Sequence, residues 1–132
     1  FLHYLPRHMS ARTLLAPDRA GSLSLGSSTQ FSDSGIVSRT LLDAERTRVV
    51  LFGFAAGQEL TEHASPARAI IQMLSGHAEW TLGTEKLTLA AGDLLHLPPG
   101  QPHAVVATEP FSMLLTLVRE NAVATPQGEG LE

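Results

Sequence analysis

The sequence contains no cysteine. This excludes disulfides, thiolate metal ligands and a cysteine nucleophile, and we expect the reducing cytoplasm as the compartment. Basic side chains are also few, because 9 Lys and Arg stand against 13 Asp and Glu, which gives a formal net charge of −4. No cluster of Lys or Arg occurs. This balance argues against nucleic acid and against an anionic membrane surface as partners.

Long apolar runs and long helical patterns are missing as well. No apolar run approaches the ~18 residues that a membrane-spanning helix needs. After residue 20, no segment has the apolar stripe of a three-turn helix. Glycine-rich phosphate loops and the Gly-x-Ser-x-Gly turn of serine hydrolases are also absent, so a metal-independent hydrolase is disfavoured.

Short apolar runs separated by Gly and Pro fill the chain from residue 22 onward. Their spacing of roughly 8–12 residues predicts an all-β sandwich or barrel. We expect strands at 22–25, 36–42, 48–55, 69–74, 78–82, 87–89, 94–97, 104–107 and 111–118, with a tight hairpin at 83–84. The 132 residues fit one domain. We expect a leader over 1–20 that is vector-derived or disordered in part, a barrel over 21–120, and a flexible tail over 121–132.

Two His residues stand close to predicted turns and strands. Strand alternation would place His63 and Ser65 on one face, and the turn over 98–102 delivers His103 to the start of another strand. We expect both imidazoles to meet inside the mouth of the barrel. The predicted pocket consists of residues on these inward faces, namely His63, Ser65, Ala69, Ile71, Met73 and His103.

The spacing of these residues resembles the two motifs of the cupin superfamily. The first motif is matched by Gly57, His63 and Gly76, and the second by Gly92, Pro98, Gly100 and His103. The resemblance implies a small single-domain bacterial cupin, whose fold is a double-stranded β-helix or jelly-roll barrel of the RmlC-like type. It also implies a homodimer, in which the segments 22–31 and 36–42 could supply a strand that crosses to the partner.

The departures from the family pattern concern metal binding. Metal-binding cupins use two His and a Glu of the first motif and the His of the second. Here His63 and His103 remain, but Ser65 replaces the second His and Ala69 replaces the Glu. Two imidazoles alone would hold a divalent ion weakly. His96 is the candidate for a third ligand, although strand alternation leaves open which face it occupies.

Other conspicuous side chains have simpler interpretations. Trp80 is expected in the core or at a dimer interface, and Arg68 and Gln72 at the surface. His77 follows Gly76 in a turn and is expected to be exposed to solvent, and Asp93, after Gly92, is expected to be a turn residue.

Three functions remain open. The first is a barrel that binds a small molecule without a complete metal-ligand set. The second is a metal-dependent dioxygenase or isomerase, in which His63, His103 and His96 hold one divalent ion such as Zn, Ni, Fe, Cu or Mn. The third is a structural or interaction dimer with a vestigial pocket. The fold alone does not choose between them.

Overall fold

The computed structural model describes residues 13–120. In this part of the chain it contains one short helix and nine strands. These are α1 (Leu25–Ser28), β1 (Val37–Asp43), β2 (Thr47–Phe54), β3 (Glu59–His63), β4 (Arg68–Ser75), β5 (His77–Leu82), β6 (Glu85–Ala90), β7 (Leu94–Leu97), β8 (His103–Val106) and β9 (Phe111–Val118). The helix is far too short to cross a bilayer, and no helix of the described residues meets that requirement.

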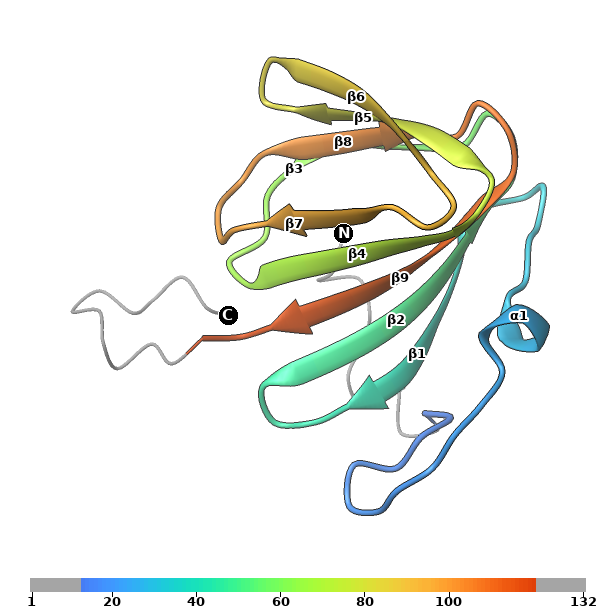
Figure 1. Cartoon of the computed structure of the whole chain (residues 1–132), viewed down its shortest axis with the longest axis vertical. Helices are drawn as coiled ribbons and strands as arrows, with labels where there is room; N and C mark the ends of the chain where they lie inside the picture. Colours follow the sequence, from blue (N-terminus) through green and yellow to red (C-terminus); the bar gives the residue numbers. More distant parts are fainter. Residues whose placement is uncertain (1–12, 121–132) are drawn as a thin grey trace.

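The strands form two antiparallel sheets that face each other. The first has the order β1-β2-β9-β4-β7 and the second the order β3-β8-β5-β6 (Figure 1). Non-consecutive strands are neighbours in both sheets, so the chain crosses repeatedly between the two layers. This confirms the predicted jelly-roll barrel. The predicted hairpin is also present, since Leu82 pairs with Glu85 across Gly83, whose φ of 65° suits a type II′ turn.

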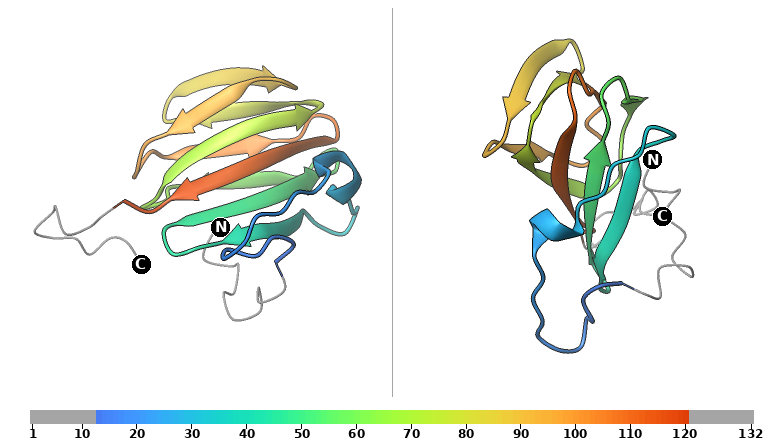
Figure 2. Two further views of the ribbon diagram at one scale, coloured as in Figure 1. Left: turned by 60° about the horizontal axis from the view of Figure 1, so that its bottom comes forward. Right: turned by 90° about the vertical axis from the view of Figure 1, so that its right-hand side faces the viewer.

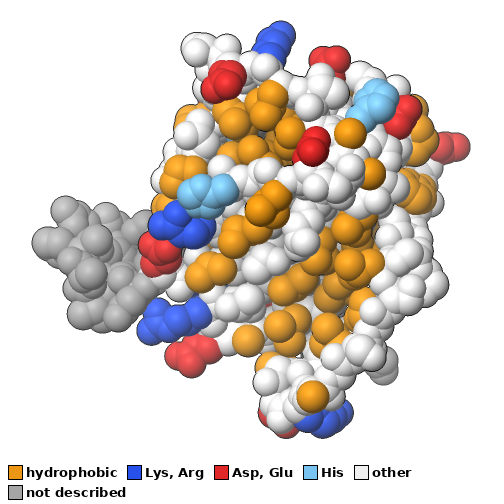
Figure 3. Space-filling view, in the orientation of Figure 1, with side chains coloured by type: hydrophobic (Ala, Val, Ile, Leu, Met, Phe, Trp, Pro, Cys, Tyr) orange, Lys and Arg blue, Asp and Glu red, His pale blue; other side chains and the backbone are white. Residues whose placement is uncertain are grey.

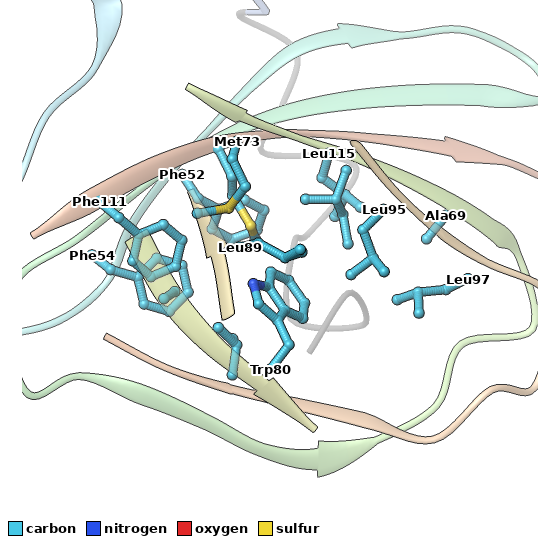
Figure 4. Packing of buried hydrophobic residues seen from close by; sticks show 14 of the residues in the cluster. Phe52, Phe54, Ala69, Met73, Trp80, Leu89, Leu95, Leu97, Phe111 and Leu115 are labelled. Carbon is cyan, nitrogen blue, oxygen red and sulfur yellow. The ribbon is translucent and has the colours of Figure 1, made fainter. Parts of the chain in front are cut away.

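Alternating apolar side chains fill the space between the sheets. Phe54 and Phe111, on opposite-running neighbours, stack with ring centroids 4.4 Å apart, and Trp80 of the second sheet is 1% exposed. Figure 4 shows the indole of Trp80 in the middle of this core, with the two Phe rings on one side and Ala69 on the other. The prediction that Trp80 is a core residue is therefore confirmed.

The N-terminal part of the described chain differs from the prediction. Residues 22–25 form no strand, and α1 begins at the last of them, Leu25, with the side chain of Ser24 accepting the N–H of Ser27 at 3.3 Å. This four-residue alternation is Ser-rich, and Ser favours caps and turns because its hydroxyl bonds to nearby backbone.

The segment before β1 lies along the chain's own first sheet (Figure 2). The N–H of Leu15 donates to the carbonyl of Leu41 at 2.8 Å. Gly53 packs so tightly against the carbonyl of Gln30 that a Cβ there would collide with it. The predicted leader therefore includes residues, from 13 to 20, that belong to the folded unit. The remainder of the leader and the predicted tail over 121–132 lie outside the described residues.

The outer surface is mixed in character. On the face that Figure 3 shows, apolar side chains gather in the middle, and Lys and Arg are scattered along the rim. Leu94 on β7 is the most exposed large apolar side chain of the described residues, at 67%.

Candidate functional site

A cavity opens between the two sheets. Its lining side chains surround about 350 Å³ of space, a figure that includes open solvent at the mouth. Seven of the ten residues that line it are apolar, and the three polar ones are His63, Ser65 and His103. The lining residues are Leu60, His63, Ser65, Ala69, Ile71, Trp80, His103, Val105, Met113 and Leu115.

A β-bulge points His63 toward this cavity. Strands β3 and β8 pair antiparallel, with Leu60 opposite Val105 and His63 opposite His103. Three positions on β3 thus span two positions on β8, which is the extra residue that defines a bulge. In a regular strand, residues 60 and 63 would face opposite sides of the sheet. The bulge lets Leu60 and His63 line the same cavity.

The two imidazoles lie against each other, as the sequence predicts. Their ring centroids are 4.3 Å apart and the ring planes are inclined by 56°. His63 Nδ1 is 2.8 Å from the carbonyl of Thr61, and His103 Nδ1 is 2.9 Å from the carbonyl of Gln101. A carbonyl only accepts, so Nδ1 carries the proton in both rings. In the neutral form, Nε2 of each ring is then an acceptor.

Burial keeps His103 in that neutral form. The side chain is 8% exposed, and desolvation lowers its pKa below the usual value, because the charged ring loses water. The hydrogen bond to the carbonyl of Gln101 acts in the opposite direction and is the weaker effect. At neutral pH, His103 therefore presents a lone pair to the cavity rather than a positive charge.

Ser65 and Ala69 occupy the positions at which metal-binding relatives carry ligands. Strand β3 ends at His63, so Ser65 does not continue that strand as the alternation argument assumes, yet it reaches the cavity from the following loop. Its hydroxyl accepts the N–H of Ala67 at 3.0 Å, and its carbonyl accepts the N–H of Gly100 at 2.8 Å. The second bond ties the two loops at the mouth of the cavity together.

His96 lies on the outer face of the first sheet, away from the cavity. Its neighbours Leu95 and Leu97 are buried, whereas His96 is exposed, as alternation along β7 requires. Arg68 Nη1 is 2.7 Å from His96 Nε2, and Arg68 Nε donates to Glu120 at 2.6 Å. This contact with Arg68 lowers the pKa of Glu120 and raises that of Arg68. The suggestion that His96 is a third metal ligand is therefore wrong.

Met73 also needs correction, because it belongs to the closed core rather than to the cavity wall. It is 2% exposed, and Figure 4 places it beside Phe52, on the opposite side of Trp80 from Ala69. Met113, its direct partner on β9, lines the cavity instead.

Half of the residues in the cavity wall are not predicted from the sequence. Alternation from His103 along β8 and within β9 identifies Val105, Met113 and Leu115, whereas the bulge in β3 conceals Leu60. The missed residues are Leu60, Trp80, Val105, Met113 and Leu115.

Other predicted positions agree with the structure. Gln72 is exposed on β4. Asp93 stabilises the turn before β7 by accepting the N–H of Ala90 at 2.8 Å. His77 is 47% exposed and lies 3.3 Å from a carboxylate oxygen of Glu109.

The donor set does not fit a stable transition-metal site. Stable sites supply three or four protein ligands, whereas here Ala69 has no donor atom and the neutral hydroxyl of Ser65 already accepts a backbone N–H. Within residues 13–120, no group of three or more His, Asp or Glu lies close enough to hold a metal ion.

These features define a double-stranded β-helix barrel with a His pair in an otherwise apolar cavity. The chain belongs to the cupin family, because residues 50–118, more than half of the chain, match the model of the cupin domain. No curated protein matches the chain in sequence.

Solved structures agree with this assignment. A conserved protein of unknown function from Streptococcus pyogenes is 33% identical, with a TM-score of 0.72, over 83% of this chain and 96% of that one. A cupin superfamily protein from Desulfitobacterium hafniense is 27% identical, with a TM-score of 0.71, over 82% and 98%. The polyketide cyclase RemF from Streptomyces resistomycificus shares the fold at 20% identity and a TM-score of 0.60, over 64% and 66%.

Proposed function

We propose that this cupin barrel binds a small, mostly apolar molecule in the cavity between its sheets, without a resident metal ion. The observation that carries the proposal is the cavity itself, in which seven apolar residues surround a polar end formed by His63, Ser65 and His103. Apolar walls with a few placed polar groups are typical of small-molecule sites. Burial of the ligand against these walls supplies affinity, and the polar end supplies orientation.

The metal-dependent enzyme is the competing proposal. One observation favours it, since a His that binds a metal commonly donates its other ring N–H to a carbonyl, and both His63 and His103 do this. Against it stands the shortage of donors at positions 65 and 69. We rank the binding barrel first because its requirements are met by the side chains that line the cavity.

Two measurements separate these proposals. Elemental mass spectrometry of the purified wild-type protein and of His63→Ala gives the metal content of each. We expect far less than one equivalent of Fe, Ni, Cu, Mn or Zn in both. Near one equivalent in the wild type, lost in His63→Ala, would contradict the metal-free proposal and support the enzyme.

Ligand binding is tested with a library of one-ring fragments, by thermal shift and by NMR. We expect hits that stabilise the wild type and lose their effect in His103→Ala. The matched control is His96→Ala, because this imidazole is exposed on the outer face of the sheet. Hits that respond equally to both substitutions would place binding outside the cavity, and a library without any hit would favour a structural dimer with a vestigial pocket.

A homodimer remains part of this proposal. Light scattering coupled to size exclusion gives the mass directly. A monomer mass near 14.1 kDa at micromolar concentration would contradict it, and twice that mass would support it.

A further inference from the structure

The polar end of the cavity narrows the chemistry of the ligand. Among the described lining residues there is no Lys, Arg, Asp or Glu. An ionic ligand would therefore meet no fixed countercharge, and an unpaired charge is costly to transfer into an apolar site. A carboxylate or phosphate would need a protonated His103, which burial opposes.

His103 instead offers an acceptor. Its Nδ1–H is taken by the carbonyl of Gln101, so Nε2 of the neutral ring can accept but cannot donate. No described residue donates a hydrogen bond to that atom. The hydroxyl of Ser65 lies at the same end and uses one lone pair for the N–H of Ala67. An incoming O–H or N–H group of a ligand is the natural partner for these atoms.

The walls of the cavity determine the shape of the rest of the ligand. The indole of Trp80 gives a flat aromatic surface, and aliphatic side chains such as Ile71 and Leu115 surround it. Figure 4 shows Leu115 and Ala69 on the side of the indole opposite to its nitrogen. Flat aromatic molecules stack favourably on such a surface.

We propose that the cavity selects a small, uncharged molecule that carries an O–H or N–H donor, as a phenol does, and that this group donates to His103 Nε2. The inference rests on the proposed small-molecule function and adds the class of the ligand. It predicts discrimination by two properties of the probe: a donor is needed, and a negative charge is excluded.

Three probes of similar size test both properties on the wild-type protein. Phenol has a ring and a donor, toluene has a ring without a donor, and benzoate has a ring with a negative charge. Each is titrated at pH 7.5 into ¹⁵N-labelled protein, with NMR as the readout. One net hydrogen bond corresponds to a preference for phenol over toluene of about fivefold. We expect this preference, with no measurable binding of benzoate.

A substitution assigns the preference to one atom. His103→Phe removes the acceptor and keeps a ring, so phenol should lose its advantage over toluene. His96→Phe is the matched control on the outer face and should retain the wild-type preference. The comparison of the three probes on the wild type stands even if His103→Phe does not fold.

The outcomes separate a failure of the proposed ligand class from a failure of the proposed small-molecule function. Equal binding of toluene and phenol, or tightest binding of benzoate, would overturn the ligand class and leave a small-molecule cavity in place. Retention of the phenol preference in folded His103→Phe would also overturn it, because the donor would then contact another group. Failure of all three probes to bind at millimolar concentration would count against the inference and the proposed function together.

Discussion

The protonation of His103 couples the stability of the barrel to pH. Burial lowers the pKa of His103 in the folded chain, whereas a His of the unfolded chain titrates near 6.5. Between these two values, the unfolded chain binds a proton that the folded chain does not. Falling pH therefore favours the unfolded state, so this contribution to stability is present above pH 6.5 and is lost as the pH falls below it.

The size of this change in unfolding free energy follows from the binding of one proton to His103. Each pH unit between the folded and the unfolded pKa is worth about 1.4 kcal/mol of unfolding free energy. From pH 7.5 to 5.5, the upper limit for His103 is also about 1.4 kcal/mol, because the upper half of this interval lies above the unfolded pKa. His103→Gln keeps a hydrogen-bonding side chain and removes the titration.

Urea unfolding at pH 7.5, 6.5 and 5.5 measures this difference. We expect the wild type to lose more stability than His103→Gln between the first and last pH, by at most about 1.4 kcal/mol. Ser65→Ala is the matched control, because it alters the same cavity without removing a titratable group, and it should follow the wild type. Parallel losses in the wild type and His103→Gln would refute the argument that burial holds His103 neutral.

Three further predictions concern packing, backbone and metal. Phe111→Ala removes a fully buried ring of the core and should lower the unfolding free energy by about 3–5 kcal/mol in urea titrations; a loss below about 1 kcal/mol would contradict the packing described. Gly76→Ala should lower the melting temperature in calorimetry more than Gly57→Ala. Both glycines have positive φ, but only at Gly76 would the new Cβ collide with its neighbours. Equal losses would contradict this, because the loss would then come from backbone strain alone. The double substitution Ser65→His with Ala69→Glu restores the ligand types of metal-binding relatives, so it should raise the metal content measured by elemental mass spectrometry toward one equivalent. An unchanged content would show that more than these two donors separates this chain from them.

Much of the barrel was predictable because its strands are short, apolar and punctuated by Gly and Pro. Alternation within β4 correctly placed Ala69 and Ile71 on an inward face. The turn before His103 correctly predicted its place at the start of β8. Local pattern was sufficient at these positions because each strand is regular and one of its faces is buried.

The remaining features depend on pairing between strands, which a local pattern does not contain. The bulge between Leu60 and His63 reverses the alternation of β3, so counting residues along the sequence misses that both side chains face the cavity. For His96, the pattern left two faces open, and only the pairing of β7 with β4 decides between them. The alternation of residues 22–25 predicts a strand, but a local pattern does not show whether another strand lies beside it.

The central claim is that the cavity beside His63 and His103 is a binding site for small molecules. It is tested most directly by ¹H–¹⁵N NMR of the wild-type protein, recorded with and without phenol, with the shifted signals mapped onto the structure. We predict shifts concentrated at residues of the cavity wall, such as His103, Val105 and Ile71, with β1 and the outer face around His96 unaffected. Shifts confined to the outer face, or no shift at millimolar phenol, would contradict the account.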